Sequence, residues 1–267
     1  MWVSLVLGVL VGAVLGLTGA GGGILAVPAL VVGMGWSMQQ AAPVALIAVA
    51  SGAALGAADG LRRKLVRYKA AMLMAAVGVP ATSLGIRVAQ GLPQRVLLMA
   101  FAGVMLLVAV RLFLQARTVG EAGNEDVVPL GRIDPGTGRF VWSWPVAALL
   151  GGIGALTGFM TGLLGVGGGF VIVPMLRRFT NLSMHGVVAT SLLVVALVGL
   201  GGVVTAVWHG AAMPLDLTAM FTVATAFGML VGRQASSRLS SRHVQLGFSA
   251  VLMVVALGLF AKATFGG

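Results

Sequence analysis

No cysteine occurs among the 267 residues of the chain, and only six residues are acidic. The lack of cysteine excludes disulfide bonds, thiolate catalysis and cysteine-ligated metal sites. No group of His, Asp and Glu residues has the spacing of metal ligands, and no nucleophile is paired with an evident base. We therefore predict a protein without a metal, a cofactor or catalytic residues, and not an enzyme.

Charge is scarce as well. Charged residues make up 9% of the chain, hydrophobic residues make up 59%, and the mean hydropathy is +1.06. Several apolar stretches approach the ~20 residues that cross about 30 Å of hydrocarbon. The sequence therefore predicts an all-α, multi-pass membrane protein in a lipid bilayer. Its net charge of +11 is typical of basic cytoplasmic loops, and we expect no binding to nucleic acid.

The chain contains an internal repeat. The segment GLTGAGGGILAVPAL at 16–30 recurs 146 residues later as GLLGVGGGFVIVPML at 162–176, with nine of fifteen positions identical. Each half of the chain has four apolar segments in the same order. We predict a first transmembrane repeat at 1–115, a polar cytoplasmic linker at 116–140 and a second transmembrane repeat at 141–267.

The first apolar segment of each half runs past thirty residues and is interrupted near its middle by glycines. Two shorter helices are expected there, either as a re-entrant hairpin or as a half-length pair. Either arrangement inverts the second repeat relative to the first and places both termini outside. Fourteen of the seventeen Lys and Arg residues then fall on one side, whereas eight simple crossings would divide them ten to seven. The charges therefore favour inverted repeats.

The duplicated glycine motifs are the candidate binding site, and the predicted ligand is an anion. Glycine allows unusual dihedral angles and close approach, and a helix that starts there presents unpaired N–H groups at the positive end of its dipole. Such donors avoid placing Arg or Lys in hydrocarbon, where each costs at least ~2.5 kcal/mol. The proline that follows each motif would break or kink the second half-helix. The predicted binding residues are Thr18, Gly21, Gly22, Gly23, Pro28, Gly167, Gly168, Gly169, Pro174, Thr190 and Ser191.

Other readings of these residues stay open. Small residues also line transmembrane helix contacts, which is the expected role of glycines outside the motifs. Hydroxyl groups within the segments, including those of Ser51, Thr157 and Thr161, can donate to an oxyanion or to the carbonyls of their own helix. No carboxylate lies deep in an apolar segment, which favours an anion facilitator or exchanger over a carboxylate-driven proton pump.

Four features resemble the sulfite exporter TauE/SafE family: the paired G-x-G-G-G-x-x-x-V-P-x-L motifs, four apolar segments per half, Thr-Ser-Leu at 190–192 and Arg-Leu-Ser-Ser-Arg at 238–242. The resemblance spans nearly the whole chain. It implies a permease of the bacterial inner membrane for small sulfur-containing or organic anions, such as sulfite or sulfoacetate. It also implies that the glycine motifs, beginning at Gly19 and Gly165, contact the substrate. One departure is that Val44 and Ala45 stand where the second half has its Thr-Ser pair.

The leading interpretation is a secondary transporter that works by alternating access, with the anion held between two opposed glycine-rich hairpins. An anion channel would use a similar backbone lining and remains the alternative. An intramembrane enzyme would need a buried nucleophile or acid–base pair, which the sequence does not provide. Substrate identity, transport direction, the coupling ion and homo-oligomer formation are left open.

Overall fold

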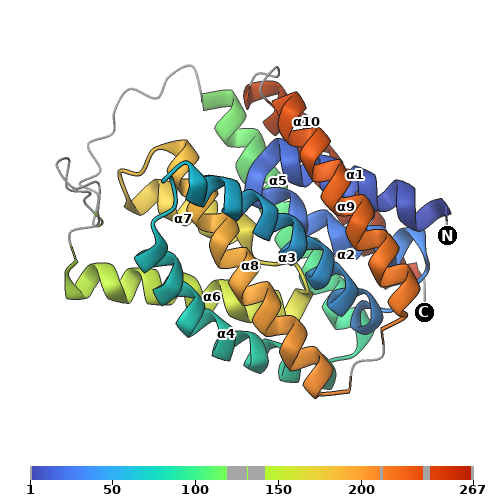
Figure 1. Cartoon of the computed structure of the whole chain (residues 1–267). Helices are drawn as coiled ribbons and strands as arrows, with labels where there is room; N and C mark the ends of the chain where they lie inside the picture. Colours follow the sequence, from blue (N-terminus) through green and yellow to red (C-terminus); the bar gives the residue numbers. More distant parts are fainter. Residues whose placement is uncertain (1, 119–130, 132–141, 211–212, 237–240, 266–267) are drawn as a thin grey trace.

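The computed structural model describes residues 2–118, 131, 142–210, 213–236 and 241–265 (Figure 1). Over these ranges the chain is helical, apart from an isolated bridge between Gly131 and Thr180. Seven of the described helices are long and apolar enough to cross a membrane. The prediction of an all-α, multi-pass membrane protein is confirmed. The predicted linker at 116–140 lies almost entirely outside the described residues.

The two halves contain the same succession of helices. The first half comprises α1 (Trp2–Thr18), the 3₁₀ helix η1 (Gly19–Leu25), α2 (Ala26–Gly33), α3 (Met38–Arg62), α4 (Tyr68–Gly91) and α5 (Gln94–Thr118). The second half comprises α6 (Trp144–Leu164), α7 (Gly169–Phe179), α8 (Met184–Trp208), α9 (Leu215–Ser236) and α10 (Ser241–Phe265). In both halves the long first segment is broken at the glycine motif.

After each glycine motif the chain turns back. The end of α2 lies beside the early part of α1, since a Cβ on Gly33 would collide with the side chain of Leu7. In the second half α7 contacts α6 and returns toward the side on which α6 begins (Figure 1). A serine side chain then caps the next long helix in each half: Ser37 caps α3 and Ser183 caps α8. These caps satisfy N–H groups that the helix itself leaves unpaired.

The first helix of each half packs against a helix of the other half. Helix α1 packs along α9, and its counterpart α6 packs along α4. Both contacts depend on glycines spaced four residues apart, where a Cβ would meet the backbone of the partner helix. This spacing keeps the small residues on one helix face and lets the backbones approach closely. On α1 these residues are Gly8, Gly12 and Gly16, and on α6 they are Gly154, Gly158 and Gly162.

Helices α3 and α8 form the centre of the molecule. They pack against each other, and their apolar windows are 67% and 61% buried, compared with 28–44% for the other five spanning helices. Helices α5 and α10 form a further pair at the periphery (Figure 1). The pairs α3–α8 and α5–α10 each combine one helix from each half, so the two halves form one packed unit.

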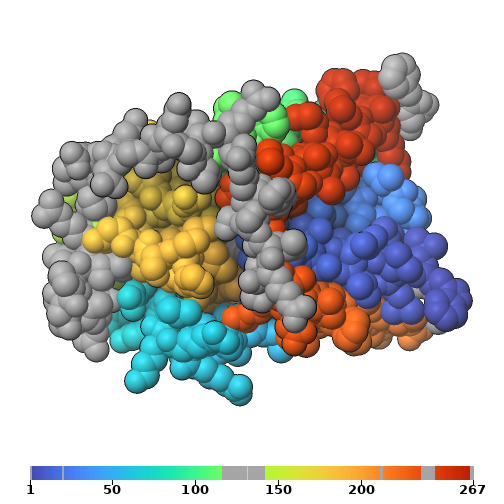
Figure 2. Space-filling model, turned by 90° about the horizontal axis from the view of Figure 1, so that it is seen from above, coloured from blue at the N-terminus to red at the C-terminus, as the bar shows by residue number. Residues whose placement is uncertain are grey.

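The connections collect at two opposite ends of the bundle. At one end the start of α8 lies beside the α3–α4 loop, because the backbone N–H of Arg67 donates to Thr190 Oγ1 at 3.0 Å. The gold and cyan surfaces of these segments are neighbours in Figure 2. At the other end Arg95 Nε donates to the carbonyl of Ala263 at 2.7 Å, and so joins the start of α5 to the end of α10. The α3–α4 loop and the end of α7 make the first end strongly basic.

Candidate functional site

The two glycine motifs meet in the centre of the molecule. A Cβ on Gly23 would lie 3.2 Å from the carbonyl oxygen of Val166. The side chain of Val49 on α3 would lie 2.8 Å from that Cβ and 3.0 Å from one on Gly167. Val49 and Val166 are buried. The structure thus brings together segments that are 146 residues apart, as a site shared by two repeats requires.

Ser191 faces this junction. On α8, Val188 contacts Gly19 of the first motif and Val195 contacts Gly167 of the second. Ser191 follows Val188 by three residues and precedes Val195 by four, so all three lie on one face of the helix. Its side chain is fully buried, and within the described part of the chain its hydroxyl has no hydrogen-bond partner. An unpaired buried hydroxyl is costly, and a bound ligand would satisfy it.

Thr190 has a different environment from its neighbour. Its hydroxyl accepts the hydrogen bond from the backbone of Arg67 in the α3–α4 loop. The two members of the predicted Thr-Ser pair therefore differ: Thr190 joins α8 to a loop of the other half, whereas the Ser191 hydroxyl has no partner among the described residues. Ligand binding by either residue stays a prediction. The sequence could not separate these roles, because the partner of Thr190 is 123 residues away.

The two motifs have different backbone conformations. In the first motif only Gly19 has a positive φ, of 75°, and the chain continues as the 3₁₀ helix η1. Such a helix uses its N–H groups in bonds to carbonyls three residues earlier. In the second motif three glycines have positive φ values of 73°, 77° and 65°, and α7 starts directly afterwards. These are Gly165, Gly167 and Gly168.

The start of α7 presents free backbone donors. Val171 and Ile172 donate their N–H groups to the carbonyl of Gly168. Gly169 and Phe170 are the first two residues of α7, so their N–H groups have no acceptor within the helix. These two groups lie at the positive end of the helix dipole. The second motif therefore places a helix N-terminus directly after its glycines, as the sequence predicts; binding of an anion there stays a prediction.

Thr157 of α6 adds a second unpaired hydroxyl beside the second motif. A Cβ on Gly168 would lie 3.0 Å from the Thr157 carbonyl and 3.0 Å from Thr161 Oγ1. Thr161 donates to the Thr157 carbonyl at 2.8 Å, whereas Thr157 Oγ1 is buried and has no partner in the described residues. Thr157 is missing from the predicted binding residues. A comparison of the halves at the 146-residue interval could have found it, because Val11 stands at the same place in the first half.

The remaining predicted residues have packing roles or line a cavity. Thr18 Oγ1 donates to the carbonyl of Val14 within α1 at 2.8 Å, as the alternative reading of its hydroxyl allows. A Cβ on Gly22 would collide with the backbone of Leu15. Pro28 and Pro174 lie inside α2 and α7, respectively. Gly22 is thus explained by close packing of η1 on α1.

A cavity of about 370 Å³ reaches both motifs. It lies between the end of α1, η1, the second half of α5, α7 and the first part of α10. From the motif regions it is lined by Thr18, Gly21, Phe170 and Pro174, so three predicted residues border it. Its wall is mainly apolar, and Arg111 of α5 and Arg177 of α7 line it as well.

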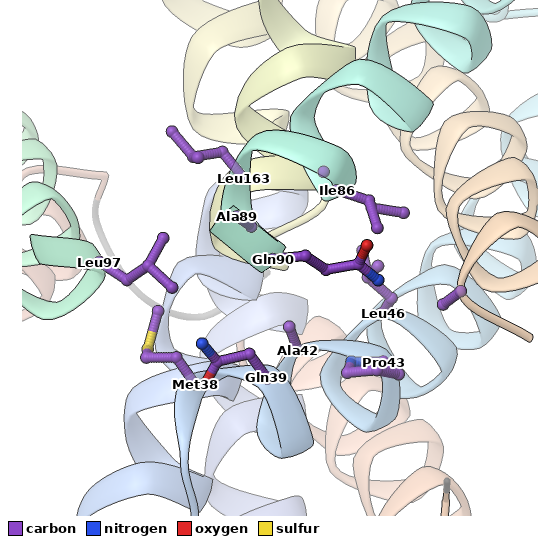
Figure 3. Close-up of a pocket in the computed structure, with 12 residues that line it drawn as sticks. Met38, Gln39, Ala42, Pro43, Leu46, Ile86, Ala89, Gln90, Leu97 and Leu163 are labelled. Carbon is purple, nitrogen blue, oxygen red and sulfur yellow. The ribbon is translucent and has the colours of Figure 1, made fainter. Parts of the chain in front are cut away.

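A smaller cavity of about 80 Å³ lies at the other ends of the helices (Figure 3). It is bordered by the start of α3, the end of α4 and the start of α5. Gln39 and Gln90 supply polar side chains to an otherwise apolar lining. The two cavities share no lining residue. The larger cavity borders the motifs, and the smaller one lies toward the opposite end of the bundle.

These features define a multi-pass membrane transport protein in which two similar halves are packed together. The chain belongs to the sulfite exporter TauE/SafE family, whose sequence model matches residues 4–259. It is similar to a probable membrane transporter protein of Bacillus subtilis, YjnA, with 27% identity over 97% of this chain and 100% of the relative. It is also similar to a probable membrane transporter protein of Xylella fastidiosa, with 28% identity over 95% of this chain and 91% of the relative. No solved structure matches the chain.

Proposed function

We propose that this protein is a secondary transporter that moves a small sulfur-containing or organic anion, such as sulfite or sulfoacetate, across the cytoplasmic membrane of a bacterium. The observation that carries the proposal is the polar environment of the second glycine motif. The start of α7 follows this motif, Thr157 lies beside Gly168, and Ser191 lies on the face of α8 that contacts both motifs; the hydroxyls of Thr157 and Ser191 have no partner among the described residues. The anion would bind to these groups.

This donor set suits an oxyanion. Backbone N–H groups and hydroxyls can replace the water around several oxygens without a fixed positive charge in the membrane. The surrounding side chains of Val49, Val166 and Val195 are buried and apolar, so hydrogen bonds at this point are stronger than in water. Backbone N–H groups can serve only an anion, and the two hydroxyls can donate to it as well.

The arrangement of the cavities supports alternating access. The larger cavity lies toward the basic end and the smaller toward the opposite end, with the glycine motifs between them. The pairs α1–α9 and α6–α4, each with one helix from each half, would move as two bodies against the central helices α3 and α8. Inverted repeats would make the two ends structurally equivalent, so that each cavity could open in turn. The structure would then represent the conformation that is open to the basic, cytoplasmic side.

The test is uptake of radiolabelled sulfite by liposomes that contain the purified protein, with unlabelled sulfoacetate, sulfate, acetate and chloride as competitors. We expect saturable uptake that a sulfur oxyanion or carboxylate inhibits, and exchange that accelerates when unlabelled substrate is inside. Exchange acceleration indicates a carrier, because a channel would give flux that inner substrate does not stimulate. Correctly inserted protein with no flux of any of these anions would contradict the proposal.

A further inference from the structure

The cavity beside the glycine motifs contains positive charge that the proposed anion site does not use. Arg111 on α5 and Arg177 on α7 both line it. Neither arginine forms an ion pair in the part of the chain that the structure describes. Arg111 lies within a spanning helix and is only partly exposed. Ionisable residues inside a membrane protein are expensive and usually mark a pathway or a binding site.

Gln245 on α10 adds a polar group to the same cavity. Its side-chain oxygen is buried and has no hydrogen-bond partner among the described residues. An amide carries two donors and one acceptor, and a rotation of its side chain exchanges the two ends. The NH₂ group of Gln245 can therefore turn toward an anion held by the two arginines. Three elements of the fold, α5, α7 and α10, thus contribute polar side chains to the cavity.

The rest of the cavity wall is apolar and suits the hydrocarbon part of a ligand. Its wall includes Val104, Leu107 and Leu112 of α5, Met184 of α8 and Phe248 of α10. The volume of about 370 Å³ falls in the range of ~300–1,000 Å³ that is typical of pockets for small organic ligands. A sulfite ion has four heavy atoms and would leave most of this wall in contact with water. The cavity therefore fits a larger ligand than the smallest anion that the central donors can hold.

We infer that Arg111 and Arg177, with Gln245, form a head-group site for an amphipathic monoanion, a sulfonate or carboxylate with an alkyl chain of several carbons, on the way to the central site. The inference rests on the proposed function, since it places this site on the route of a transported anion. The arginine pair binds the charged group, and the aliphatic and aromatic wall covers the chain. The chemistry shared by soluble alkyl sulfonates and anionic lipids meets these requirements, and we assign the site to the soluble anion.

The test is binding of methanesulfonate, butanesulfonate and hexanesulfonate to the purified full chain in phosphatidylcholine nanodiscs, measured by calorimetry. Each added CH₂ group that enters the apolar cavity should tighten binding about fourfold. The double variant Arg111→Gln/Arg177→Gln should bind hexanesulfonate at least about tenfold more weakly, because each charge-assisted hydrogen bond it loses is stronger than a neutral one. Thermal unfolding of each variant checks that it is folded.

Arg178 provides a matched control. It is adjacent to Arg177 in sequence, lies 5.9 Å above the ring of Phe179 and does not line the cavity. Arg178→Gln should change the affinity for hexanesulfonate less than about twofold, as expected for an arginine outside the site. Equal affinities for the three sulfonates would overturn the inference without the use of any variant. Equal losses in Arg178→Gln and in the double variant would overturn it as well.

Two further measurements show whether the ligand is a lipid or a soluble anion, and whether a failed test disproves this site or the proposed transport. If phosphatidylglycerol in the nanodisc displaces hexanesulfonate, the occupant is a membrane lipid and the assignment to a soluble anion is overturned. Sulfite uptake by the same wild-type preparation tests the proposed function separately. Uptake without hexanesulfonate binding would disprove this site alone, whereas specific binding without any anion flux would support the site and disprove transport.

Discussion

The two glycine motifs have nearly the same sequence and very different surroundings. The second motif is bordered by Thr157 and Thr161, and its glycines open into a loop before α7. Ser191 lies on the face of α8 from which Val195 contacts this motif. At the corresponding places, 146 residues earlier, the first half has Val11, Leu15 and Ala45. These side chains are buried and apolar. At these three places the duplicated glycine pattern is thus combined with hydroxyl side chains in the second half only.

This difference indicates that the repeats have divided two roles. The first motif provides a compact 3₁₀ segment that packs on α1, and close approach explains its glycines. The second motif provides the N–H groups of a helix start beside unpaired hydroxyls, and the proposed anion would satisfy them. The proposed anion site draws most of its hydrogen-bonding groups from the second half. It is compatible with the paired packing of the two halves, because both motifs still form its walls.

Substitution at Gly168 should have the largest effect. Gly168→Ala places a Cβ against Thr157 and forces a non-glycine residue to a φ of +65°, which costs roughly 1–2 kcal/mol before any collision. We expect sulfite uptake to fall at least about tenfold, since the start of α7 must move. In the first motif, Gly21→Ala should keep most of the uptake, because the nearest atoms to its Cβ would be 3.8 Å away.

The control for this pair is Gly103→Ala on α5, where a Cβ would meet nothing within 4 Å. All three variants are compared at equal amounts of inserted protein in the same liposomes. Full uptake by Gly168→Ala, or a greater loss in Gly21→Ala than in Gly168→Ala, would contradict the division of roles between the motifs.

Removal of the Ser191 hydroxyl should have the next largest effect. A hydrogen bond to a charged group contributes about 1.5–3 kcal/mol, so Ser191→Ala should raise the KM for sulfite by roughly tenfold or more. Ser249→Ala is the control, because the Ser249 hydroxyl is buried but already donates to the carbonyl of Leu246 at 2.8 Å. KM is measured from initial rates of uptake; an unchanged KM in Ser191→Ala would remove this residue from the site.

Thr190→Val should affect stability and leave substrate binding unchanged. The substitution removes the acceptor for the Arg67 N–H, and loss of one such bond costs about 1 kcal/mol. We expect a melting temperature lower by a few degrees, as for a loss of this size in a mid-sized protein, with KM for sulfite unaltered. A shift in KM comparable to that of Ser191→Ala would show that the two hydroxyls act together.

Loss of the ion pairs of Asp59 should have the smallest effect on stability and transport. Asp59 on α3 pairs with Arg233 on α9 and with Arg63 at 2.9 Å, at the basic end of the bundle. At the equivalent contact of the other end, Ser83 and Thr205 share a hydrogen bond of 3.2 Å. Exposed pairs contribute little and are screened by salt. Asp59→Asn should lower the melting temperature slightly at low salt and not at high salt; a large loss of transport would instead show that α3 and α9 must stay linked.

Much of the architecture could be predicted from the sequence. Hydropathy fixes the helical class, and the duplicated glycines mark where α1 and α6 end, because helices are interrupted where glycine clusters precede proline. The meeting of the motifs follows from their place in two similar halves. Ser191 lies on the inner face of α8, and its role in binding stays a prediction.

Other features could not be read from the chain. The motifs differ in the sign of φ at Gly22 and Gly168, which depends on the side chains packed around each and not on the glycine itself. The role of Thr190 depends on a loop in the other half. The cavity arginines were predicted only as cytoplasmic charges, since sequence position does not show which helix ends border a common space.

The central claim is that the second glycine motif holds the anion. The most direct test is equilibrium binding of sulfite to the purified protein, compared between Thr157→Val/Ser191→Ala and the mirror variant Val11→Thr/Ala45→Ser. We expect the first variant to lose affinity at least about tenfold, because two hydrogen bonds to the anion are removed, while the mirror variant binds like the wild type. Unchanged affinity in the first variant, with both proteins folded, would contradict the claim.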